Sequence, residues 1–140
     1  MNHVFRLVNG DDLKVKINEY VKSHNIEAGI VKCGVGCVYE AKFRLADGES
    51  IFYNKDNYEI VSLMGTVSKN GSHIHISLSD REGKTIGGHL VDGCLINTTC
   101  EVCIEELPNY KFNREYDEST GYKELVIEEV DNKTHLLKKI

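Results

Sequence analysis

Three histidines, His73, His75 and His89, are the residues in this sequence whose type and spacing best support chemistry. They lie in two runs of alternating polar and apolar residues on either side of Arg81-Glu82-Gly83, which is the pattern of a β-hairpin. A three-residue loop with Gly83 in the left-handed conformation places His75 opposite His89. His73 shares the face of His75, because side chains alternate along a strand. We therefore expect the three imidazoles to converge.

Three neutral imidazoles with an open fourth position are a common ligand set for zinc or a similar divalent metal. We therefore predict a metal site at these histidines, with zinc as the expected ion. The simpler interpretation is a polar strand that only exposes its histidines, and a one-residue register slip would turn His89 to the other face. A His-x-His pair also occurs in the cupin metal motif. That motif needs a glutamate shortly after the second histidine, whereas Glu82 falls in the expected turn.

One amphipathic helix is predicted near the N-terminus. Asp11 and Asp12 can cap its free amides, and Asn25 provides a left-handed stop. The residues that share one helical face are Leu13, Ile17, Tyr20, Val21 and His24.

The rest of the chain reads mainly as β-strands. The first run is broken by glycines, including Gly34 and Gly36, which suit a bulge or a close backbone approach. One helix followed by many strands predicts a single α+β domain with a mostly antiparallel sheet. We expect this domain over residues 1–130 and a polar tail over 131–140 that frays or docks weakly. The expected strands are 26–45, 58–68, 72–79, 85–91, 94–107 and 124–128.

The five cysteines are expected to be free thiols, because their number is odd and no export signal is visible. Small buried structural roles are expected for all of them. Cys100 and Cys103 have the spacing of half a zinc knuckle, but on a strand their thiols point to opposite faces. The five positions are Cys33, Cys37, Cys94, Cys100 and Cys103.

Four charged residues are further candidates for the site. Arg44 and Arg114 stand among apolar and aromatic neighbours, where we favour a packed ion-pair partner over a phosphate or carboxylate clamp. Glu59 and Glu101 could each bring a carboxylate to the histidines from a neighbouring strand.

Composition limits the classes of function. A net charge of −5 disfavours general nucleic-acid binding, which depends on cationic side chains. No apolar run is long enough to cross a bilayer and no signal peptide is visible, so we expect a cytoplasmic protein without a membrane partner. Nucleotide-binding and nucleophile-elbow motifs are absent from the sequence.

The sequence resembles the PPC ("plants and prokaryotes conserved") domain family, often described as predicted DNA-binding domains, over almost its whole length. Singly the shared residues are weak signals, but their order is specific. They are Phe5-Arg6-Leu7, Gly10, Asp12-Leu13, Ile26-Glu27-Ala28-Gly29, Gly34-Val35-Gly36, Glu59 to Thr66, His73 to Asp80, Gly83, Gly87-Gly88-His89-Leu90, Gly93, Thr99, Glu101, Phe112, Arg114, Thr120-Gly121-Tyr122 and Leu125.

The resemblance implies an α+β domain that assembles as a homotrimer, with a histidine cluster suited to zinc in prokaryotic members. Close backbone packing at Gly87-Gly88 and Gly34-Val35-Gly36 agrees with such an assembly. Plant members carry an Arg-Gly-Arg AT-hook before the domain that reads the minor groove of A·T-rich DNA. These 140 residues contain no such hook, so we expect weak DNA binding without sequence preference.

Three functions follow from these observations. The first is a non-enzymatic DNA-associated module, active in transcription regulation, in which the metal or the trimer organises a binding surface. The second is a metal-dependent small-molecule-binding protein or enzyme, in which the open metal position activates water or polarises a carbonyl. The third is a structural assembly domain whose histidines bridge strands. The sequence names no substrate and favours a role without catalysis.

Overall fold

The computed structural model describes residues 1–131 and 133–140. Helices and strands do not alternate along the described residues: one helix near the start is followed by eight strands. Their order is β1 (Asn2–Val8), α1 (Leu13–Ser23), β2 (Gly29–Arg44), β3 (Ile51–Ser68), β4 (Gly71–Ser79), β5 (Thr85–Leu90), β6 (Leu95–Glu106), β7 (Tyr110–Asp117), β8 (Tyr122–Val130) and β9 (Leu137–Lys139).

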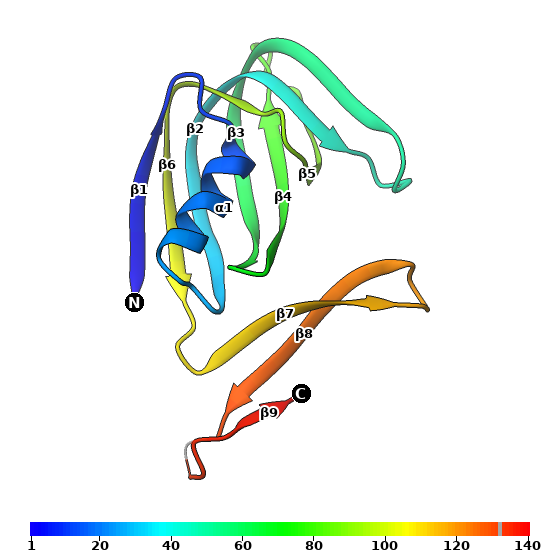
Figure 1. The fold of residues 1–140 in the computed structure, drawn as a ribbon. Coiled ribbons are helices and arrows are strands. Elements are labelled where there is room, and N and C mark those ends of the chain that lie inside the picture. Colours follow the sequence, from blue (N-terminus) through cyan, green and yellow to red (C-terminus); the bar gives the residue numbers. More distant parts are fainter. Residues whose placement is uncertain (132) are drawn as a thin grey trace.

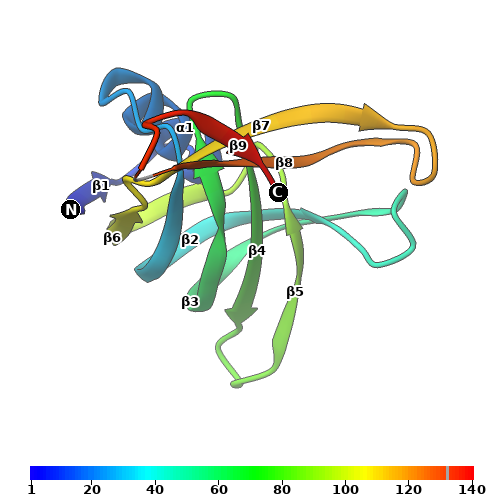
Figure 2. The same cartoon turned by 90° about the horizontal axis from the view of Figure 1, so that it is seen from below.

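The strands form two antiparallel sheets. The larger has the order β1-β6-β2-β3-β4-β5, and it curls until the end of β2 also pairs with β5 through Phe43–Leu90 and Arg44–His89. The smaller sheet, β7-β8-β9, crosses beneath one end of the larger one, as two perpendicular views show (Figures 1 and 2). The α+β class with mostly antiparallel pairing is confirmed.

Helix α1 covers one face of the six-stranded sheet (Figure 1). As predicted, Asp12 caps it, because its side chain accepts a hydrogen bond from the Val15 amide at 3.2 Å. Asn25 follows the helix with a φ of 51°, the left-handed stop that the sequence indicated. The apolar face buries Leu13, Ile17 and Val21 completely against the sheet.

The glycines of β2 allow the close approach that was predicted there. The register between β2 and β6 shifts at Gly36, and a Cβ at this position would lie 2.1 Å from the Thr99 carbonyl oxygen. Only a residue without a side chain fits such a distance. A second register shift lies between Val31 and Cys33, so the expected bulge is also confirmed.

Two strands were only partly predicted or missed. In the smaller sheet β7 was missed, and in the larger sheet β3 begins at residue 51 instead of 58. Both segments are rich in polar residues, and tertiary pairing overrides their weak strand signal. The smaller sheet is anchored at Phe112, whose amide donates to the Glu27 carbonyl at 3.0 Å and whose carbonyl accepts from Asn70 Nδ2 at 3.0 Å.

The C-terminal segment does not simply fray. Its β9 pairs with β8, for example Leu137 opposite Val130. The expected domain boundary at residue 130 stays a prediction. Within the described residues, no helix is long and apolar enough to cross a membrane.

Candidate metal centre

The hairpin β4–β5 has the register that its turn chemistry predicted. The Asp80 amide donates to the Lys84 carbonyl at 2.9 Å, and Gly83 has the left-handed φ of 85°. His75 lies opposite His89, which excludes the one-residue slip. The paired strands therefore bring the predicted imidazoles together.

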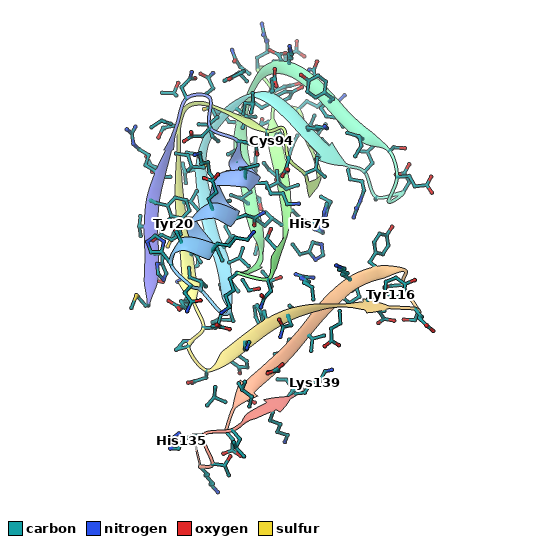
Figure 3. All side chains as sticks on the ribbon, viewed as in Figure 1. Tyr20, His75, Cys94, Tyr116, His135 and Lys139 are labelled. Carbon is teal, nitrogen blue, oxygen red and sulfur yellow. The ribbon has the colours of Figure 1, made fainter. Side chains whose placement is uncertain are left out.

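All three histidines meet at one site. The ring centroids of His73 and His75 are 4.9 Å apart, those of His73 and His89 are 5.1 Å apart, and those of His75 and His89 are 5.8 Å apart. One nitrogen from each ring can be chosen so that all lie within 4.8 Å of one another. Figure 3 labels His75, which lies in the middle of β4 and above the β7–β8 hairpin in this view.

The donor set fits a tetrahedral metal ion. The Nε2 atoms of His73 and His75 are 3.2 Å apart. Zinc with Zn–N distances of about 2.0–2.1 Å separates its ligand nitrogens by about 3.3–3.4 Å. The Nδ1 atom of His89 is buried without a hydrogen-bond partner among the described residues, which suits an atom that could bind a metal ion.

The electrostatics keep two of the rings uncharged. Burial, assisted by the positive charge of Arg44, lowers the pKa of His89 to about 4. Burial also lowers the pKa of His73, and proximity to His75 and Arg114 adds to the effect. Both imidazoles are therefore neutral at physiological pH, which is the form that binds a metal ion.

Neither arginine forms the ion pair that the sequence favoured. Among the described residues, no carboxylate lies within 4.0 Å of the Arg44 or Arg114 guanidinium groups. Arg44 instead lies over the ring of Tyr122, with its guanidinium carbon 5.7 Å from the ring centroid. Arg114 donates from Nη2 to Thr66 Oγ1 at 3.2 Å. The preferred interpretation was therefore wrong, and both guanidiniums keep unused donors.

The carboxylate beside the histidines is not one of the two that the sequence suggested. Glu59 and Glu101 do not belong to the cluster of metal-ligand atoms, and both side chains are exposed. Glu124 on β8 borders the same pocket as His73 and His89. Sequence reasoning missed it because only the packing of one sheet on the other brings β8 to this place.

The expectation of buried cysteines holds for two of the five. Cys94 and Cys100 are fully buried, and burial raises their pKa values to about 11 and about 12. Cys33 is exposed, and Cys37 and Cys103 are half-buried, because they lie on the uncovered face of the six-stranded sheet. All five thiols are free, as predicted.

Comparison with known proteins supports the same architecture. The chain is 39% identical over 129 residues to the bifunctional protein GlmU of a Synechococcus strain. The matched region covers 92% of this chain but 21% of that protein, so this chain spans about a fifth of the relative's length. A solved hypothetical protein from Salmonella enterica shares 30% identity, with 92% and 94% of the two chains covered and a TM-score of 0.88.

A second solved structure with a similar fold is described as that of a metal-containing protein. It comes from Archaeoglobus fulgidus, with 29% identity, 89% and 91% coverage and a TM-score of 0.73. The family itself is shown by sequence, because residues 1–108 match the Plants and Prokaryotes Conserved (PCC) domain, here also called PPC. This chain therefore belongs to the PCC domain family.

Proposed function

We propose that this protein is a cytoplasmic, homotrimeric PCC-domain module that holds one zinc ion on His73, His75 and His89 and acts in regulation. The convergence of three imidazoles on a rigid hairpin carries the proposal. Such an ion would be held by three neutral ligands and keep a fourth position for water or another molecule. The main-chain pairing of β4 with β3 at His73 and with β5 at His75 and His89 orients the three rings without the ion.

Elemental analysis of protein purified without a histidine tag tests the metal site. We expect about one divalent ion per chain in the wild type and its loss in His75→Ala. His24→Ala is the matched control, since His24 is exposed at the end of α1 and should retain the metal. Equally little metal in wild type and His75→Ala would refute the proposal.

The face of the six-stranded sheet opposite α1 supports the trimer. Its exposed apolar side chains include Val4 (74% exposed), Val35 (57%), Val61 (58%) and Met64 (63%). Apolar side chains gathered on one face mark an interaction surface. Light scattering should give three times the 15.8 kDa of one chain, and Met64→Glu should reduce that mass. Tyr116→Glu, at an exposed site of β7, should leave it unchanged. A monomer across micromolar concentrations would refute the assembly.

DNA association is expected to be weak. The chain carries a net charge of −5, and the charges in and just before α1 are mixed: Lys14, Lys16 and Lys22 occur together with Asp11, Asp12 and Glu19. DNA binding through only two or three lysine–phosphate contacts weakens quickly as salt is added. The affinity falls by roughly 0.9 log units per phosphate contact for each tenfold rise in salt concentration. Labelled A·T-rich and mixed duplexes titrated with metal-loaded protein at about 150 mM salt test this point. Submicromolar affinity with a clear preference for one duplex would overturn it.

A second candidate function is metal-dependent binding of a small molecule, with or without catalysis. The observation that favours it is the pocket of about 400 Å³ that His73 and His89 share with Arg44 and Arg114. A bound zinc ion would supply a Lewis acid at the edge of this space.

A further inference from the structure

The pocket beside the histidines is built by both sheets. It has a volume of about 400 Å³ and lies between β4, β5 and the β7–β8 hairpin, at the lower end of the size that suits small molecules. Its lining contains two guanidinium groups, one ammonium group and one carboxylate. These residues are Arg44, Arg114, Lys123 and Glu124.

The two guanidiniums belong to different sheets and line the same pocket without a fixed anionic partner among the described residues. Arg44 comes from β2, directly opposite His89 in the sheet, and Arg114 comes from β7. Burial lowers the pKa of Arg114, so its charge is poorly solvated where it stands, and Glu124 offsets this only in part. A guanidinium of this kind gains most from an oxyanion, which it can bind through two parallel hydrogen bonds.

Metal binding would increase the local excess of positive charge. Three neutral imidazoles leave the full double charge of a divalent ion uncompensated. Arg44 and Arg114 line the same pocket as His73 and His89. Glu124 is the one carboxylate among the pocket residues. A further anion would therefore be bound more tightly than a neutral molecule of the same size.

We propose that Arg44 and Arg114 bind the carboxylate or phosphate group of a small molecule, beside the histidines, where an oxygen of this group would be able to reach a metal ion held by His73 and His89. This inference rests on the proposed metal site. A small molecule is favoured over a DNA backbone because the arginines belong to a pocket between two sheets of an acidic protein.

Cobalt(II)-loaded protein provides a direct test, because the visible absorption of the ion reports a change in its ligands. Acetate, inorganic phosphate and neutral acetamide are titrated in separate arms, and calorimetry measures their affinities. We expect acetate or phosphate to change the spectrum and acetamide to leave it unchanged. The stronger of the two anions identifies the group that the natural ligand carries.

Substitutions separate the arginines from general charge effects. Arg44→Gln and Arg114→Gln should each weaken anion binding by about tenfold to hundredfold while the metal content stays the same. Arg81→Gln is the matched control, because Arg81 lies in the turn of the same hairpin and pairs with Asp56 at 2.6 Å. Glu124→Gln should tighten anion binding, since it removes the competing negative charge.

Several outcomes would overturn the inference. One is acetamide binding as tightly as the anions, and another is an unchanged anion affinity in both arginine variants. A third is displacement of phosphate by a DNA duplex at about 150 mM salt, which would assign the arginines to a nucleic-acid backbone. Absence of metal in the elemental analysis would refute the proposed function separately. In that case phosphate is titrated into the metal-free wild type and the metal-free Arg114→Gln variant. Weaker phosphate binding in the variant would still support the arginine site, and equal binding would refute it.

Discussion

The two faces of the six-stranded sheet are built by the same strands but serve different purposes. Along β4, Ile74, Ile76 and Leu78 point into the core, and each is at most 3% exposed. The residues between them include His73 and His75, which lie on the outer face and are exposed. Each of these histidines is thus next to a side chain that the core holds in place, Ile74 in both cases.

This alternation explains how an exposed site can be preorganised. A ligand on a loop needs its own supporting contacts, whereas a ligand on a buried strand is oriented by the packing on the other side of the sheet. The outer face contributes few packing contacts of its own. It instead carries exposed apolar residues such as Val35 and Met64, which belong to the proposed assembly surface.

Substitution in the inner face should have the largest effect. Leu78 is fully buried, so Leu78→Ala removes core contacts and leaves a cavity, and we expect it to lower the free energy of unfolding by about 2–5 kcal/mol. Met64→Ala on the outer face should change the unfolding free energy of the dissociated chain by about 0.5 kcal/mol or less. Chemical denaturation followed by circular dichroism measures both.

Measuring the unfolding free energy of Met64→Ala at several protein concentrations tests the two faces further. Met64→Ala should become destabilising only where the wild type is assembled, because the methionine is then buried by a neighbour. An equally large loss for Met64→Ala and Leu78→Ala in dilute protein would contradict the division between the faces.

The features that could be predicted from the sequence are those set by local chemistry. The turn at Gly83 and the two-residue period of β4 were sufficient to predict the register that joins His75 to His89. The cap at Asp12 and the stop at Asn25 likewise gave the helix.

The features that were missed depend on contacts between distant segments. β7 has polar residues on both faces and forms because β8 pairs with it. Glu124 therefore reaches the histidine pocket through the docking of a whole sheet, for which the sequence contains no local signal. The same docking leaves Arg44 and Arg114 without the ion pairs that their apolar surroundings suggested.

A smaller loss should follow from weakening the helix that covers the inner face. Asp12 accepts hydrogen bonds from the Val15 amide at 3.2 Å and the Gly93 amide at 2.8 Å, so it joins α1 to the loop before β6. We expect Asp12→Ala to lower the free energy of unfolding by about 0.5–2 kcal/mol. Thermal unfolding measures the change.

Asp131→Ala is the matched control for the cap. Asp131 accepts from the Lys133 amide at 2.7 Å, in the turn that precedes β9. Its loss should loosen β9 and leave the main unfolding transition in place, because β9 pairs only with β8 within the described residues. If the two variants unfold alike, the helix cap does not support the inner face in the way described.

The smallest expected effect is a difference in alkylation rate between cysteines on the two faces of the sheet. The nucleophile in alkylation is the thiolate. Burial raises the pKa of Cys94 to about 11 and that of Cys100 to about 12, so at pH 8 the thiolate fraction of Cys100 is about one part in ten thousand. Cys33 is exposed on the outer face. Iodoacetamide in the native state should therefore label Cys33 first and spare Cys94 and Cys100, as peptide mass spectrometry would show.

Assembly changes this labelling pattern in a way that tests the outer face again. Cys33 lies two residues before the exposed Val35 on β2, so a subunit packed on this face should slow its alkylation. Met64→Glu, which is expected to dissociate the trimer, should restore rapid labelling of Cys33 and leave Cys100 protected. Rapid labelling of Cys100 in the wild type would mean that the inner face opens in the native protein, and the comparison between the faces would fail.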